Sequence, residues 1–370
     1  MHANEIVQLR LQNQGLIKPA FLQSPDVVSK MVCTQAQFFP GAKWSLGLRM
    51  KPGSTNASDA MLEKAVNEGQ IARAWSFRGT IHLMAPEDSE TLTSLAAPSV
   101  LGRLKASRRK LGLDDAALSK IDKLVHQALA HKNFLTREQL LAFLEKQGIA
   151  AKGEMLSHLI YRASLMGQIC IGPMQGKQYT LALTQDWLPG ISQISREKAL
   201  AEVALRYFTS HGPATLQDFA WWIPLSAADA AAGLKAVKYE LIQVNAGNRT
   251  LWMHKDAHTK QLSGSQSLGE AQAIFLPAYD EYLFGYKDRS DVVDDAHLKH
   301  LNAANGFSPA IIIKGRAAGT WSRVIGKKKL VVSAILFSPA DSETHELLQK
   351  AAGRYAAFLG LEADLKVAVL

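Results

Sequence analysis

Residues 71–84 read Ile-Ala-Arg-Ala-Trp-Ser-Phe-Arg-Gly-Thr-Ile-His-Leu-Met, and they predict a β-hairpin. Apolar residues alternate with polar ones on both sides of Arg78-Gly79, the pattern of two paired strands joined by a tight turn. Segments with helical spacing of apolar residues precede this hairpin at 4–14, 25–37 and 58–69. Helices followed by a terminal hairpin are typical of the winged helix, a variant of the helix-turn-helix that docks a helix against duplex DNA. We therefore expect a first winged helix in residues 1–100.

The same order of elements recurs twice along the chain. The second copy has predicted helices at 114–131, 137–147 and 153–167, then strands around 169–172 and 178–181. The third has predicted helices at 196–210, 215–223 and 226–239, then strands around 242–244 and 250–253. Self-similarity at a period of roughly ninety residues marks a repeated architecture. We expect a second winged helix in 101–190 and a third in 191–256.

The pattern changes after a polar, linker-like stretch at 256–270. Strands are predicted at 273–276, 310–313, 316–321 and 329–333, followed by a helix at 342–358. The predicted fold class is α+β, with three tandem winged-helix units followed by a small C-terminal β-rich domain, a partial barrel, at 257–370.

Composition restricts the class of protein. The 370 residues suffice for two or more domains. A net charge of +9 and a pI near 9.4 favour a polyanionic partner such as nucleic acid. Only two cysteines, Cys33 and Cys170, argue against a disulfide scaffold or a thiolate metal site and fit a reducing cytoplasm. The N-terminus lacks the pattern of a signal peptide, and no apolar run reaches the ~18 residues of a membrane span. We expect a soluble cytoplasmic protein.

Two glutamines two positions apart, Gln35 and Gln37, lie just before Pro40. Pro40 disfavours helical geometry at the preceding residue, so the pair is expected at or near the end of the helix at 25–37. In a helix this spacing points the two amides to different sides, whereas in an extended segment it puts them on one side. A neutral amide cannot act as a general base, but it accepts and donates hydrogen bonds and so can position a water. Solvated surface glutamines are the alternative.

Four segments of the chain carry a resemblance to a known family. They are 34–37 (TQAQ) with 44–49 (WSLGLR), 78–83 (RGTIHL), 276–289 (LPAYDEYLFGYKDR) and 315–321 (GRAAGTW). The chain resembles the bacterial winged-helix DNA glycosylases that excise alkylated purines, including those that confer self-resistance to azinomycin-type crosslinking agents. The hallmark of that family is Gln, an apolar residue, then Gln or Asp, and Gln35-Ala36-Gln37 matches its Gln-Gln form. The resemblance implies that both glutamines act on the water that attacks the sugar.

The chemistry of an amide pair points to one class of substrate. A purine alkylated at N7 or N3 is cationic and leaves as a neutral base, so it needs neither protonation of the leaving group nor a strong nucleophile. Positioning of the water and electrostatic stabilisation of an oxocarbenium-like sugar then dominate. The Gln pair therefore favours cationic lesions over uracil or intact purines.

Other residues of the four segments are candidates for binding DNA or the lesion. Arg78 is predicted to contact phosphate and His82 to form a hydrogen bond near the lesion, with a tight turn and a satisfied polar group as the alternatives. Asp280 or Glu281 is a candidate for stabilising positive charge on the sugar, and tyrosines of the same segment for stacking on a base. The predicted DNA- and lesion-binding set is Trp44, Arg78, His82, Tyr279, Asp280, Tyr282, Arg316 and Trp321.

Basic residues are concentrated at two further places in the sequence. One cluster comprises Arg103, Lys105, Arg108, Arg109 and Lys110, and the other is 327–329 (KKK). Contacts from such residues to phosphates add salt-dependent affinity that does not depend on sequence, although a solvated face is the usual role of a charge run. Trp221-Trp222 follows at helical spacing from other apolar residues, which predicts core packing.

The predicted function is that of a monofunctional DNA N-glycosylase without metal or cofactor. Its expected partner is double-stranded DNA that carries alkylated purines, with interstrand crosslinks as further candidate substrates, and it is expected to act as a cytoplasmic, nucleoid-associated monomer. A winged-helix transcriptional regulator and a damaged-DNA binder without catalysis are the alternatives. A regulator would bind one defined sequence tightly and release no base.

Overall fold

The first two predicted hairpins lie in one continuous sheet. In the computed structural model, which describes residues 1–190, 194–257, 272–303 and 306–370, six strands pair in the order β1-β3-β2-β5-β6-β4. Their bounds are β1 Cys33–Gln35, β2 Ala72–Trp75, β3 Ile81–Met84, β4 Leu135–Thr136, β5 Ile169–Gln175 and β6 Gln178–Leu183. Both hairpins are antiparallel, and Arg73 of β2 pairs with Ile171 of β5. The regions 1–100 and 101–190 are therefore joined through their strands.

The region around the Gln pair differs from the prediction. Its helices are α1 Ala3–Asn13, α2 Ser24–Met31, α3 Phe39–Arg49 and α4 Asp59–Asn67. The predicted helix at 25–37 was wrong in its last six residues, because Val32 adopts a φ of 69° and the chain continues as β1. Pro40 begins α3 instead of ending a helix. Proline is favoured in a first helical turn, where its missing N–H has no intrahelical partner in any case.

A helix that was not predicted, α5 Ser89–Lys110, contains Pro98 and spans the expected boundary between the first and second regions. It is preceded by the 3-10 turns η1 Phe77–Gly79 and η2 Pro86–Asp88 and followed by α6 Asp115–Leu129, α7 Arg137–Lys146, α8 Glu154–Leu165 and α9 Thr184–Trp187. A capping box begins α7: Gln139 N donates to Thr136 Oγ1 and Gln139 Oε1 accepts from Thr136 N.

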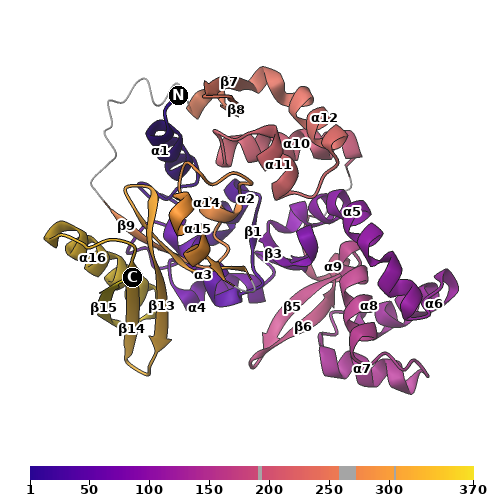
Figure 1. Cartoon of the computed structure of the whole chain (residues 1–370). Coiled ribbons are helices and arrows are strands. Elements are labelled where there is room, and N and C mark those ends of the chain that lie inside the picture. The colour runs from indigo at the N-terminus through magenta and orange to yellow at the C-terminus, as the bar shows by residue number, and fades with distance from the viewer. Residues whose placement is uncertain (191–193, 258–271, 304–305) are drawn as a thin grey trace.

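The helices and strands of the third region lie close to the predicted ranges. Its helices are α10 Arg196–Ser210, α11 Leu216–Trp222 and α12 Ala227–Val237, followed by η3 Lys238–Glu240 and the strands β7 Leu241–Ala246 and β8 Arg249–His254. This hairpin makes a two-stranded sheet of its own. Figure 1 shows the region above β1 and β3, with α10 and α11 facing them.

The C-terminal region contains a five-stranded sheet of order β15-β14-β13-β12-β9. Its elements are β9 Ala273–Leu276, α14 Glu281–Phe284, α15 Asp295–Leu301, β10 Asn302–Ala303, β11 Gly306–Phe307, β12 Ala310–Ile313, β13 Arg316–Ile325, β14 Lys329–Leu336, α16 Ser342–Leu359 and β15 Glu362–Val369. The predicted strands are present, and β15, which was not predicted, pairs parallel to β14 after the crossover through α16. Residues 258–270 of the predicted linker lie outside the described residues.

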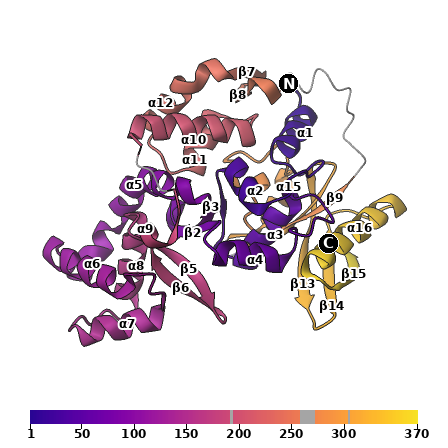
Figure 2. The same cartoon turned by 180° about the vertical axis from the view of Figure 1, so that it is seen from behind.

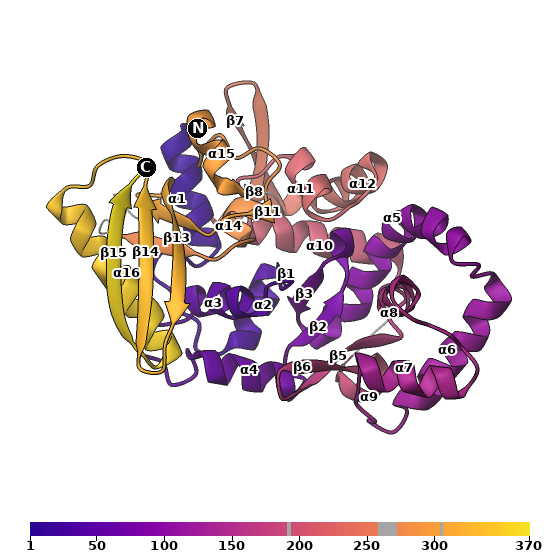
Figure 3. The same ribbon diagram turned by 60° about the horizontal axis from the view of Figure 1, so that its bottom comes forward.

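The C-terminal region shares a hydrophobic core with the first region. Trp44 of α3 packs against Tyr355 and Phe358 of α16, and Tyr355 packs against Trp321 of β13. Figures 2 and 3 show the C-terminal strands beside α3 and α4, with the second region on the opposite side of the molecule. Among the described residues, no helix combines the length and apolar character needed to span a membrane.

Candidate active site

The Gln pair lies on the outer edge of the six-stranded sheet. Gln35 is the last residue of β1 and pairs with His82 of β3. Beyond it the chain remains attached to β3, because Ala36 N donates to Ile81 O at 2.7 Å and Gln37 Oε1 accepts from Ile81 N at 3.3 Å. The Gln35 side chain is buried, whereas Gln37 is exposed. The pair thus sits on extended backbone between β1 and α3, not at a helix C-terminus.

Among the residues that the structure describes, several buried polar atoms without a protein partner lie at or beside this pair. They include Oε1 of Gln35, Oγ1 of Thr34 and Nε2 of His82. Buried polar groups in proteins almost always have a hydrogen-bond partner, so several unpaired ones on adjacent strands require an explanation. Hydrogen bonds from these atoms to a water or to a substrate are one explanation.

His82 is a neutral hydrogen-bonding group at this site. Burial, with a contribution from the nearby positive charge of Arg78, lowers the pKa of His82 to about 3. Its Nδ1 lies 3.1 Å from Thr80 O and 3.0 Å from Ser76 Oγ. A carbonyl oxygen only accepts, so the Thr80 contact assigns the proton to Nδ1. Nε2 is then an unpaired acceptor.

Glu281, the first residue of α14, is the carboxylate that contacts the Gln pair. Its Oε1 accepts from Gln35 N at 3.3 Å, and its Oε2 accepts from Trp222 Nε1 at 2.8 Å. Nε2 of the buried His211 lies 3.5 Å from the same Oε2. The sequence left Asp280 and Glu281 as alternatives, and the predicted set took Asp280. In the sequence, the only sign that Glu281 belongs to the candidate site is its position in segment 276–289, one of the four segments that carry the family resemblance.

Asp280 has a different environment from its neighbour. Its two carboxylate oxygens bind the Arg49 guanidinium at 2.9 and 3.0 Å, and one of them also accepts from Ser45 Oγ. Burial alone would raise the pKa of Asp280, but Arg49 and the hydrogen bonds lower it overall. Asp280 is fully buried and fully bonded, so its contacts assign it to joining α3 to α14.

Arg78 forms part of the turn between β2 and β3. It adopts a φ of 54°, and its Nη1 donates to the carbonyl oxygen of Trp222 at 2.9 Å. The guanidinium lies over the rings of Trp221 and Phe284, and burial lowers its pKa. The predicted core role of Trp222 is confirmed by its complete burial, whereas Trp221 is half-buried and stacks with Arg78.

Half-buried aromatic rings surround this arginine. Phe284 packs edge-on against Trp221, Tyr279 and Phe307. The Arg289 guanidinium lies over the Phe307 ring at 4.4 Å. Of the tyrosines that were predicted to stack on bases, Tyr279 alone among Tyr279, Tyr282 and Tyr286 retains partial exposure.

Four other predicted residues are occupied by contacts within the protein. Trp44, Tyr282 and Trp321 are in the core, and each donates a hydrogen bond of 2.7 Å to a backbone carbonyl: Phe275 O, Gly315 O and Leu276 O respectively. Arg316 is half-buried, donates to Asp291 O and forms an ion pair with Asp294. These contacts give the four residues structural roles, and their burial lends no support to the predicted contact with DNA.

The first basic cluster lies on the C-terminal half of α5. A hollow of about 480 Å³ there is lined by Lys105, Arg108, Arg109, Gly112, Leu113 and Asp114. Lys105 and Arg109 are exposed, whereas Arg108 forms an ion pair with Asp115. The 327–329 cluster is exposed in the turn between β13 and β14. Neither cluster contacts the Gln pair in the described residues.

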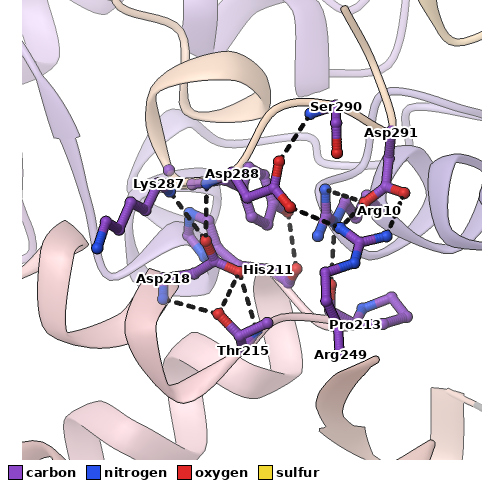
Figure 4. Close-up of polar contacts among 12 residues, drawn as sticks. Arg10, His211, Pro213, Thr215, Asp218, Arg249, Lys287, Asp288, Ser290 and Asp291 are labelled. Carbon is purple, nitrogen blue, oxygen red and sulfur yellow. Dashed lines mark hydrogen bonds and ion pairs between the residues drawn. The ribbon is translucent and has the colours of Figure 1, made fainter. Parts of the chain in front are cut away.

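A buried polar network fixes the segment that follows α14. Asp291 binds Arg249 of β8, and its Oδ2 lies 3.5 Å from Nη1 of Arg10 in α1. Figure 4 shows both arginines beside Asp291. Asp218 of α11 accepts from the backbone N–H groups of Lys287 and Asp288. These contacts hold the segment directly after α14 against α1 and the third region, and they thereby restrict the position of α14 and of Glu281.

Comparison with known proteins identifies the family. Residues 28–358 match the family described as DNA glycosylase AlkZ-like. An interstrand DNA cross-link repair glycosylase of Streptomyces sahachiroi is 25% identical over 356 residues, which cover 89% of each chain. The solved structure of Streptomyces sahachiroi DNA glycosylase AlkZ matches the fold with a TM-score of 0.83 over 100% of both chains, at 22% identity. The resemblance inferred from the sequence is confirmed, and the chain belongs to the AlkZ-like DNA glycosylase family.

Proposed function

We propose that this protein is a monofunctional DNA N-glycosylase that hydrolyses the N-glycosidic bond of cationic N7- or N3-alkylated purines in duplex DNA. Interstrand crosslinks made through such purines are included among its substrates, since a relative of similar length bears the name of a cross-link repair glycosylase. The observation that carries the proposal is the unpaired, buried Oε1 of Gln35 next to the exposed amide of Gln37.

In the proposed mechanism Gln35 and Gln37 together orient one water towards the anomeric carbon of the damaged nucleotide. The buried amide of Gln35 is fixed by β1, and the exposed amide of Gln37 reaches the solvent side. The purine leaves with both electrons of the C–N bond and becomes a neutral base, so neither amide has to remove a proton before that bond breaks. The water then bonds to the anomeric carbon and releases its proton to solvent. His82, neutral with an unpaired Nε2, is placed to accept a hydrogen bond from the water or from the base.

The rest of the chain would hold the DNA. In this proposal three winged-helix units and a C-terminal β-rich domain form the binding surface, with the α5 cluster and the 327–329 turn contacting phosphates. The enzyme acts as a cytoplasmic monomer at the nucleoid. It uses no lysine Schiff base, so its product is an intact abasic site.

Release of free base tests the mechanism. Duplex DNA containing N7-methylguanine would be incubated under single-turnover conditions with the wild type, Gln35→Ala and Gln37→Ala. The exposed Gln147 at the end of α7, changed to Ala, serves as a matched control. We expect release by the wild type and the control and a loss of at least about 100-fold in both site variants, the scale of a lost positioning group. Undiminished release in both site variants would sink the mechanism.

The same assay separates the alternative functions. A regulator or a damage binder without catalysis would release no base from wild-type incubations, although it would still bind DNA. A duplex joined by a purine N7 crosslink, analysed on a denaturing gel, tests the crosslink substrate: separation of the strands supports it. Borohydride treatment during turnover should trap no covalent complex with a monofunctional enzyme.

A further inference from the structure

Glu281 is a buried carboxyl group that forms no ion pair with an arginine or lysine among the described residues. The residue is 1% exposed, and its hydrogen-bond donors are the neutral N–H groups of Gln35 and Trp222. His211 lies 3.5 Å away, but burial lowers its pKa, so it is uncharged at neutral pH. An unpaired buried carboxylate is costly for a fold.

Neither of the two nearby arginines forms an ion pair with Glu281, although the positive charge of Arg78 acts on the carboxylate through space. Arg78 donates to the carbonyl oxygens of Trp221 and Trp222, and Arg49 binds Asp280 in two places. The adjacent carboxylates Asp280 and Glu281 therefore contrast: one has a bidentate cation and the other has only neutral donors. The lack of a hydrogen-bonded cation is therefore specific to Glu281 and is not shared by Asp280.

The Glu281 carboxylate is hydrogen-bonded directly to Gln35 of the Gln pair. Glu281 Oε1 binds the main-chain N–H of Gln35, and the Gln35 side chain carries the unpaired Oε1. A cation bound beside these amides would experience the field of Glu281 across a region from which water is largely excluded, where charges interact more strongly than in water. Fixed charges aimed at a developing charge stabilise it without reorganisation during the reaction.

We propose that Glu281 is a positioning residue with an electrostatic role. It holds the backbone of Gln35, and the charge of its carboxylate, which is not hydrogen-bonded to an arginine or lysine, favours the cationic sugar that forms as the purine leaves. This inference rests on the proposed glycosylase function and deepens it. It explains the proposed preference for positively charged lesions by two features. One is the charge of Glu281 next to the Gln pair, and the other is the weakness of the amides as bases.

Binding of uncleavable DNA separates the electrostatic role from a structural one. Two duplexes would be compared, one with a pyrrolidine abasic analogue, which is cationic, and one with tetrahydrofuran, which has similar shape and is neutral. We expect the wild type to bind the pyrrolidine duplex more tightly. Glu281→Gln keeps an acceptor for Trp222 but removes the charge, and it should reduce the pyrrolidine preference about tenfold while changing the tetrahydrofuran Kd less than about threefold.

Trp222→Phe is the matched control, because it removes the hydrogen bond to Glu281 and retains the charge. It should lower the melting temperature and keep the pyrrolidine preference. An unchanged preference in Glu281→Gln, or an equal loss in Trp222→Phe, overturns the proposal. If Glu281→Gln fails to fold, Glu281→Asp replaces it: this variant retains the charge and withdraws it from Gln35, so the preference should persist while base release slows.

Failure of this inference is distinguishable from failure of the glycosylase function. Absence of base release by the wild type refutes the function. A wild type that releases N7-methylguanine, combined with a charge preference that does not depend on Glu281, refutes only the role of Glu281.

Discussion

Arg49 of α3 and Asp280 of the loop before α14 form a bidentate ion pair, and both side chains are fully buried. The pair joins the helix that follows Gln37 to the short helix that begins with Glu281. This contact between two segments far apart in the sequence therefore fixes the distance between the Gln pair and Glu281.

Removal of one partner should be far more damaging than removal of both. Arg49→Met leaves a buried carboxylate unpaired, and we expect it to lower the free energy of unfolding by about 3–5 kcal/mol. The double variant Arg49→Met/Asp280→Leu should be less destabilised than either single variant. Urea unfolding of the four proteins of this cycle provides the measurement, and additive effects would contradict a coupled pair.

His82 makes stability depend on pH. Its pKa of about 3 in the folded protein lies below the ~6.5 of an unfolded histidine, so the unfolded chain binds more protons below pH 6.5. The stability that neutral His82 contributes is thus fully present above pH 6.5 and is lost as the pH falls. At pH 5 the loss should reach about 2 kcal/mol from this residue alone.

Two variants test this assignment. Urea unfolding at pH 7.5 and 5.0 should show a smaller pH-dependent loss in His82→Asn than in the wild type. His345, exposed on α16, is the control, and His345→Asn should keep the wild-type dependence. Equal dependence in wild type and His82→Asn would exclude His82 as the source.

The turn at Lys314-Gly315 should tolerate no side chain at its second position. Gly315 has a φ of 81°, and a Cβ there would lie 2.0 Å from Val7 Cγ1 of α1. Gly315→Ala should therefore lower stability by roughly 2 kcal/mol or more, from the strained backbone and the overlap together. Thermal unfolding should show partial recovery in Gly315→Ala/Val7→Ala, because the second change removes the overlapping methyl group. No recovery would assign the whole loss to the backbone.

Local patterns predicted most of the helices and all three hairpins, since apolar periodicity and caps such as Thr136 and Thr215 act over a few residues. They failed where the signal was ambiguous. The apolar segment before Gln35 has helical spacing, but Val32 turns it into β1, and the pairing of β1 with β3 provides the hydrogen bonds that keep it extended. Strand β15 was missed because its pairing partner β14 lies beyond a whole helix.

The site was less predictable than the fold. The motif predicted the Gln pair as the candidate site, but the choice between Asp280 and Glu281 depends on Arg49 and Trp222, which are distant in sequence from both. Trp44 and Trp321 belong to family-like segments because they build the shared core. Sequence similarity reports that a residue type is retained, and it does not distinguish packing from contact with a ligand.

Exposed cations on α5 should contribute to DNA affinity in a salt-dependent manner. Each phosphate contact releases condensed counterions, so the slope of log K against log salt decreases in magnitude by about 0.9 for each contact that is removed. Lys105→Gln/Arg109→Gln removes two exposed charges beside the 480 Å³ hollow and should reduce the slope by about 2. Fluorescence anisotropy with an undamaged duplex from about 50 to about 300 mM salt measures the slope.

The control variant is Lys350→Gln, at an exposed site on α16, which should leave the slope unchanged. A slope that is equally unaffected by the α5 variant would place the duplex elsewhere on the molecule, because a charge that contacts phosphate cannot be removed without changing the number of released ions.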